Sequence, residues 1–150
     1  MATSNAATTY LENKLLAYIF KNDSGSFSSP GDSIYVGLAT GSPSAADRDA
    51  GTLTEVSTTT QDANYARQQV TAANWNLANS STDTQTVTNS ANIEFAASSG
   101  IASYTVTIAF IADAATGGNI LFVGELDASK TIASGDIFRI NLGNLTIELK

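Results

Sequence analysis

The chain has 150 residues and a net charge of −7, with 43% hydrophobic and only 14% charged residues. It contains no cysteine and no histidine, which excludes disulfide bonds, thiolate metal sites, cysteine nucleophiles and histidine general bases. Its seven Lys and Arg form no basic patch, so we expect binding to neither nucleic acid nor membrane. The length suits a single domain over 1–150, with a flexible arm at 1–8, a helix at 9–21 and a β-sandwich at 33–150.

One amphipathic helix is predicted near the start of the chain, over 9–21. Thr9 and Glu12 have the spacing of a capping box, in which each side chain satisfies a free amide of the first turn. An apolar stripe follows at helical spacing and consists of Leu11, Leu15, Tyr18 and Ile19. Such a stripe usually packs on its own domain, which is the expected role here. Docking onto a partner is the alternative.

The rest of the chain reads as about seven or eight short strands separated by turns. Turn signals recur at roughly ten-residue spacing, which predicts a mainly β fold, an antiparallel β-sandwich or a jelly-roll-like barrel. From Tyr104 to Phe110 large apolar residues alternate with Thr and Ala, which is typical of a strand buried on one face. Gly117 and Gly118 then predict a hairpin with the strand 120–126. The small, polar stretch 41–51 is predicted to be a long exposed loop.

The acidic residues do not form a recognisable catalytic or metal-binding pattern. Glu55, Glu94 and Glu125 lie on or beside predicted strands, where alternation turns them towards solvent. Asp47 and Asp49 resemble the start of a calcium loop, but the turn glycine and the bidentate glutamate of that loop are missing. We therefore expect no enzymatic activity, no catalytic residue, no cofactor and no metal site.

Glu55 and Arg67 form a candidate structural ion pair. The chain is poor in charge, and a charged side chain in the interior of a β protein requires a partner of opposite sign. Arg67 is therefore expected to bridge carbonyl groups or to pair across strands, with Glu55 as its partner.

Several sequence blocks occur in an order that resembles a known family. They are Leu-Glu-Asn-Lys-Leu-Leu at 11–16, Tyr-Val-Gly-Leu-Ala-Thr at 35–40, Thr-Glu-Val at 54–56, Tyr-Ala-Arg at 65–67, Thr-Gly-Gly-Asn-Ile at 116–120 and Ser-Gly-Asp at 134–136. These blocks resemble small phage virion structural proteins that are commonly labelled phage tail fibre proteins. The chain departs from that pattern in its Ser-rich stretch at 24–33 and its polar stretch at 76–89.

The resemblance implies a non-enzymatic bacteriophage structural protein, made in the host cytoplasm and located in the virion. We expect a capsid decoration or cement protein on the outer head surface, with a tail fibre or tail-associated protein as the alternative. A carbohydrate-binding adhesin is the alternative of another class, with Tyr35, Tyr65 and Trp75 as its candidate aromatic residues. The expected partners are the major capsid protein or tail proteins, together with further copies of the chain in a dimer or trimer.

Overall fold

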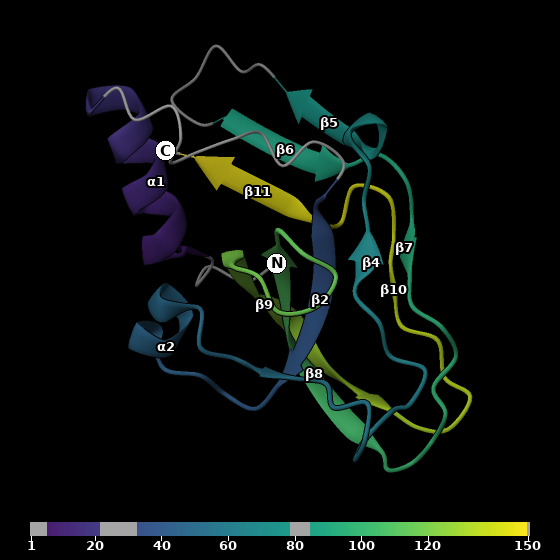
Figure 1. The fold of residues 1–150 in the computed structure, drawn as a ribbon. Helices are drawn as coiled ribbons and strands as arrows, with labels where there is room; N and C mark the ends of the chain where they lie inside the picture. The colour runs from purple at the N-terminus through teal and green to yellow at the C-terminus, as the bar shows by residue number, and fades with distance from the viewer. Residues whose placement is uncertain (1–5, 22–32, 79–84, 150) are drawn as a thin grey trace.

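The computed structural model describes residues 6–21, 33–78 and 85–149 (Figure 1). Its helices and strands, in chain order, are β1 (Ala6–Ala7), α1 (Thr9–Phe20), β2 (Tyr35–Thr40), α2 (Ala45–Ala50), β3 (Thr54–Glu55), β4 (Gln68–Gln69), the 3-10 helix η1 (Ala72–Asn74), β5 (Trp75–Ala78), β6 (Gln85–Asn89), β7 (Ile93–Glu94), β8 (Tyr104–Ala112), β9 (Ile120–Ile132), β10 (Arg139–Ile140) and β11 (Thr146–Leu149). The predicted mainly β fold with one longer helix near the start is confirmed.

The strands form three antiparallel sheets. The largest has the order β1-β9-β8-β2-β3, and β4 also pairs with β2. The strands β5, β6 and β11 form a second sheet with β6 in the middle, and β7 pairs with β10. Figure 1 shows the second sheet at one end of β2. The strands β7 and β10 run along one side of β2 in the same view. The sheets stay open at their edges, so the fold is not the closed barrel that was one of the two predicted forms.

The predicted hairpin between β8 and β9 is present, but a register shift interrupts it. Pairing passes from Val106–Lys130 to Ile108–Glu125, so one residue of β8 stands opposite four of β9. Such a bulge changes which side chains share a face. Val106 belongs to the principal core, whereas Ile108 and Phe110 belong to a second apolar cluster. The second half of β8 is thus buried on both faces, and the expectation of one buried face was wrong there.

The principal core lies between the largest sheet and the β7–β10 pair. The largest sheet contributes Val36, Leu38 and Val106, while β7 and β10 contribute Ile93 and Ile140. On the second cluster's side, Phe110 lies against Gly37 of the neighbouring strand, and a Cβ atom at position 37 would overlap its ring. A glycine is therefore needed for this close approach.

Helix α1 nearly coincides with the predicted helix 9–21, but Thr8 caps it in place of Thr9. The Thr8 hydroxyl accepts a hydrogen bond from the Leu11 amide at 3.5 Å and donates one to the Ile120 carbonyl at 2.6 Å. Residues 6–8 are therefore part of the fold, since β1 also pairs with β9. The predicted flexible arm at 1–8 was wrong for these residues. Positions 1–5 of that arm lie outside the described residues.

A short helix, α2, occupies the stretch that was predicted to be a long exposed loop. Ser44 caps it, and the Ser44 hydroxyl accepts from the Asp47 amide at 3.2 Å while the Asp47 carboxylate accepts from the Ser44 amide at 3.1 Å. This capping box satisfies two amides of the first turn. Gly51, at a φ of 68°, ends the helix in the left-handed conformation that favours glycine. The loop prediction was wrong because it relied on the small, polar composition of the stretch and did not consider the capping box or the glycine that ends the helix.

Candidate functional site

Arg67 and Glu55 form a bidentate ion pair at the base of the β8–β9 turn. Arg67 Nε lies 2.8 Å from Glu55 Oε1, and Nη2 lies 2.8 Å from Oε2. The remaining nitrogen, Nη1, donates to the carbonyls of Ala114 and Gly117, each at 2.8 Å. The guanidinium also lies over the ring of Phe110, 5.0 Å from its centroid. The Arg67 side chain is 6% exposed and the Glu55 side chain is 32% exposed, so the pair ties the strand β3, the segment before β4 and the turn before β9 together at the edge of the core.

Tyr65 joins this pair to the centre of the sheet. Its hydroxyl donates to Glu55 Oε1 at 2.8 Å and accepts from the amide of Leu38 at 2.9 Å. Burial raises the pKa of Tyr65 well above its usual range, and hydrogen bonds from Arg67 to Glu55 raise the pKa of the guanidinium. Tyr65 and Arg67 thus each keep one protonation state near neutral pH, which suits a structural role and not proton transfer.

A buried carboxylate, that of Asp62, organises the loop before Tyr65. Its Oδ1 accepts from the amides of Asn64 at 3.0 Å and Ser99 at 2.9 Å, and its Oδ2 accepts from the Tyr104 hydroxyl at 3.0 Å. Burial by itself raises the pKa of Asp62, but these hydrogen bonds stabilise the ionised carboxylate more strongly. The pKa of Asp62 therefore lies below its usual value. Burial and the bond to Asp62 raise the pKa of Tyr104 to about 12. No sequence pattern marks this aspartate beyond its position in a polar loop.

The other two glutamates considered from the sequence also pair with arginines. Arg48 Nη1 lies 2.6 Å from Glu125 Oε1, and Arg139 Nε donates to Glu94 Oε2 at 2.6 Å. Glu55, Glu94 and Glu125 therefore belong to three separate ion pairs, and they do not converge on one another. In the described parts of the chain, no three His, Asp or Glu side chains gather where they would hold a metal ion.

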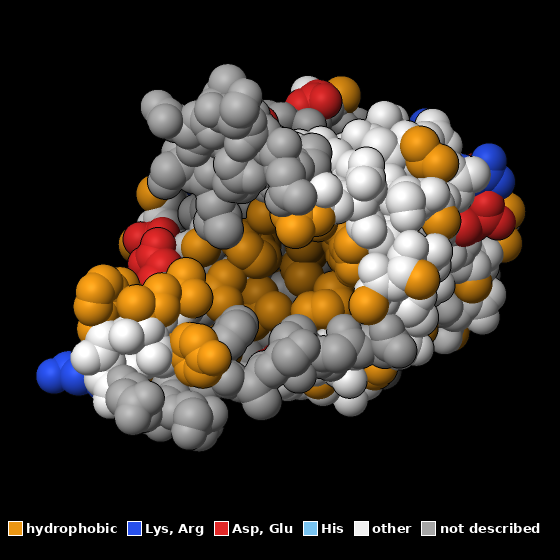
Figure 2. Space-filling model, turned by 90° about the horizontal axis from the view of Figure 1, so that it is seen from above, with side chains coloured by type: hydrophobic (Ala, Val, Ile, Leu, Met, Phe, Trp, Pro, Cys, Tyr) orange, Lys and Arg blue, Asp and Glu red, His pale blue; other side chains and the backbone are white. Residues whose placement is uncertain are grey.

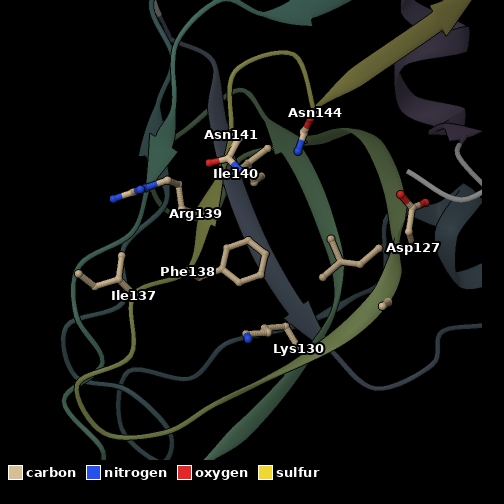
Figure 3. A pocket seen from close by; sticks show the side chains of 10 residues that line it. Asp127, Lys130, Ile137, Phe138, Arg139, Ile140, Asn141 and Asn144 are labelled. Carbon is tan, nitrogen blue, oxygen red and sulfur yellow. The ribbon is translucent and has the colours of Figure 1, made fainter.

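An open groove of about 570 Å³ lies between β9 and the segment around β10. In Figure 3 the ring of Phe138 stands between the two walls, with Lys130 and Asp127 coming from the β9 side. Asn141 and Asn144 add amide groups at the rim. Asp127 belongs to the four-residue bulge of β9, so the bulge forms part of the groove wall. An apolar ring with several polar groups around it suits a ligand that presents both C–H and hydroxyl groups.

The predicted helix-face residues fall into two environments. Leu11 is 9% exposed and packs with Ile111 and Leu121, whereas the others are largely exposed: Leu15 at 40%, Tyr18 at 50% and Ile19 at 57%. Leu11 is thus the residue of this set that is buried against the domain as predicted.

An apolar hollow of about 260 Å³ lies close to α1, and Figure 2 shows the hydrophobic side chains that form its floor. The residues that line it are Ile34, Trp75, Leu77, Val87, Ile111, Leu121, Phe122 and Ile147. They come from the three-stranded sheet, from β8 and β9, and from the residue before β2, so residues distant in sequence build this surface together.

The aromatic residues considered for a carbohydrate site do not gather on one exposed face. Tyr65 is buried in the core, Tyr35 lies half-buried in β2, and Trp75 lines the apolar hollow. Phe138 is the aromatic residue that lines the open groove between β9 and the segment around β10, and the sequence analysis did not identify it. Its alternation with Ile137 and Arg139 resembled ordinary strand patterning, and nothing in the sequence placed it opposite β9.

These features define a mainly β protein whose candidate sites are surfaces and buried ion pairs. The family model described as podophage GP4 fiber I protein gp80 matches residues 6–148, nearly the whole chain. The chain therefore belongs to this family of phage fibre structural proteins. No match was found among curated proteins. Within the described residues, no helix has the length and apolarity needed to cross a membrane.

Proposed function

We propose that the chain is a non-enzymatic component of a phage tail fibre and acts in the virion through contacts with other virion proteins. The observation that carries this proposal is the family match, which spans residues 6–148 and whose description names a fibre protein. The structure is compatible with a scaffold role, since the buried Arg67 side chain is held by a bidentate pair with Glu55 and the buried Asp62 carboxylate by hydrogen bonds. The family match supports a phage fibre structural protein, and attachment of this chain to the tail is the part that we propose.

The capsid decoration role expected from the sequence is the competing proposal, and copy number separates the two. A tail fibre follows the low rotational symmetry of the tail, so we expect on the order of tens of copies per particle. Decoration of a head lattice requires on the order of hundreds. Quantitative mass spectrometry against the major capsid protein, with gold-labelled antibody to locate the chain, measures both quantities. Hundreds of copies on the head would reject the fibre proposal in favour of decoration.

A second candidate function, saccharide binding by the fibre, is favoured by the groove around Phe138. A pyranose ring packs its C–H face on an aromatic ring, while Asn141 and Asn144 offer hydrogen bonds to its hydroxyl groups. Open surface grooves of this kind hold saccharides weakly, so we expect dissociation constants of about 1 mM.

NMR titration with host cell-wall oligosaccharides should shift amide signals around the groove, and Phe138→Ala should abolish the shifts. Leu142→Ala is the matched control, because Leu142 is exposed near the groove but does not line it. Absence of any shift at about 10 mM saccharide, well above the expected constant, would reject this second function.

A further inference from the structure

The groove around Phe138 reverses the charge balance of the chain. Over the whole sequence, acidic residues outnumber basic ones by 14 to 7. Among the residues that line the groove, two are basic, Lys130 and Arg139, and one is acidic, Asp127. An anion that the rest of the surface repels is therefore not repelled here.

The two basic residues differ in what their charges do. The Arg139 guanidinium pairs with Glu94, to which its Nε donates at 2.6 Å. None of the ion pairs in the described parts of the chain includes Lys130. In Figure 3 the Lys130 side chain extends towards the segment with Phe138, while Asp127 lies farther along β9. The ammonium group of Lys130 is thus the charge in the groove that a ligand can use.

The register of β8 and β9 explains why Lys130 points into the groove. Lys130 pairs with Val106, and Ile132 follows two residues later. Val106 and Ile132 are both buried in the principal core. Residues that stand opposite one another, and residues two apart on one strand, share a face of the sheet. The Lys130 side chain therefore lies on the face that β7 and β10 cover, and its exposed end reaches the groove beside them.

The chain also holds the uncharged groups of the groove in place. The Phe138 ring packs edge-on against Phe95, with the ring centroids 5.8 Å apart. The turn that carries Asn141 and Asn144 is fixed by the buried side chain of Asn89, whose Nδ2 donates to the Asn141 carbonyl at 2.9 Å. A site that is ordered before binding loses little conformational entropy when a ligand enters it.

We propose that the groove prefers negatively charged saccharides, those with a carboxylate or a phosphate group, and that Lys130 binds the charged group. This inference rests on the second candidate function, saccharide binding in the groove. In Figure 3, Lys130 lies on one side of Phe138, and Asn141 and Asn144 lie on the other. A sugar ring stacked on Phe138 can therefore place its charged group at Lys130 and its hydroxyl groups at the two amides.

The chemistry of lysine determines the size and the breadth of this preference. An ammonium group is a compact charge with three donors, so it binds carboxylate and phosphate groups alike. Because the groove is open to water, the attraction has the strength of an exposed ion pair, which corresponds to a roughly two- to fivefold gain in affinity. Salt screens such an attraction, so the preference should shrink as ionic strength rises.

NMR titration of the full chain with three sugars tests the proposal. Glucose, glucuronate and glucose 6-phosphate share one ring and differ only in the group on its exocyclic carbon. At low ionic strength the two acids should bind roughly two- to fivefold more tightly than glucose, as measured by the shifts of amide signals around the groove. Lys130→Gln should remove this difference while glucose still binds, and Lys130→Arg, which keeps the charge, should retain it.

Lys21→Gln is the matched control, because it removes the same charge at the end of α1 and Lys21 does not line the groove. This variant should prefer the acids as the wild type does. Loss of the preference in Lys21→Gln as well would overturn the inference, because the net charge of the chain would then explain it.

The other outcomes separate this inference from the function on which it rests. Equal binding of the three sugars, or a preference for the acids that survives Lys130→Gln, would overturn the inference and leave saccharide binding in place. Binding of none of the three at about 10 mM would overturn both. A preference for only one of the acids would support the inference and identify carboxylate or phosphate as the group that is recognised.

Discussion

Replacing Arg67 with alanine should destabilise the protein by about 1–3 kcal/mol, the usual cost of removing one partner of a hydrogen-bonded charge, because the Glu55 side chain that remains is 32% exposed. The change leaves the Glu55 carboxylate without its bidentate partner and removes both hydrogen bonds to the turn carbonyls of Ala114 and Gly117. It also opens a space over the ring of Phe110, against which the guanidinium lies. Urea denaturation monitored by circular dichroism measures the free energy of unfolding.

Arg139→Ala is the matched control, because Arg139 forms the same kind of ion pair with a glutamate at a solvent-exposed position. Arg139 pairs with Glu94, but its side chain is 48% exposed against 6% for Arg67. An exposed pair contributes about 0–1 kcal/mol, so this variant should lose little stability. In a double-mutant cycle, Glu55→Ala should cost less when Arg67 is already alanine. If Arg67→Ala cost no more than Arg139→Ala, the pair would not be the brace that its geometry suggests.

Replacing Asp62 with asparagine should destabilise the protein at neutral pH by about 2–3 kcal/mol and should weaken its response to acid. An asparagine side chain keeps one oxygen for the Asn64 and Ser99 amides, but it puts an NH2 donor where the second carboxylate oxygen accepts from the Tyr104 hydroxyl, and it removes the negative charge that strengthens all three bonds. The lowered pKa of Asp62 means that the folded state favours the ionised carboxylate. This contribution is fully present above about pH 4 and is lost as the pH falls through the lower folded pKa.

Urea denaturation at pH 7 and at pH 3 measures both effects. The wild type should lose more stability between these two pH values than Asp62→Asn does, because the variant has no carboxylate to protonate at this position. Asp49→Asn, at an exposed position in α2, should keep its stability at pH 7 within about 0.5 kcal/mol. Equal losses in the wild type and in Asp62→Asn would contradict the role assigned to Asp62.

The sequence predicted those parts of the fold that depend on local pattern. Alternation and Gly117-Gly118 were enough for the β8–β9 hairpin, because residues next to each other in the chain determine both signals. The bulge opposite Thr107 could not be predicted, since it depends on the match between two strands and the layers around them. The helix α2 was predictable in principle from Ser44 and Asp47, but its small and polar composition pointed to a loop.

In the candidate sites too, the features that depend on local pattern were predicted, and those that depend on contacts between distant segments were not. Glu55 and Arg67 were paired from the sequence because charges are scarce and a buried one needs a partner, and their side chains do meet. Phe138 and Asp127 come together only through the course of β9 and the chain around β10, which no local pattern encodes. The exposure of Leu15 and Ile19 could not be predicted either, because periodicity identifies an apolar stripe but does not show which surface, if any, covers it.

The bulge of β9 also protects the protein against uncontrolled growth of its largest sheet. Among the described strands, only the two residues of β1 pair with the side of β9 that faces away from β8. A long, flat edge of this kind would recruit strands from neighbouring copies and lead to aggregation. Here the irregular segment at 126–129 bends the strand, and it carries the exposed side chain of Asp127 with Lys130 directly after it. A charged and bent edge resists strand addition even where many copies are crowded together.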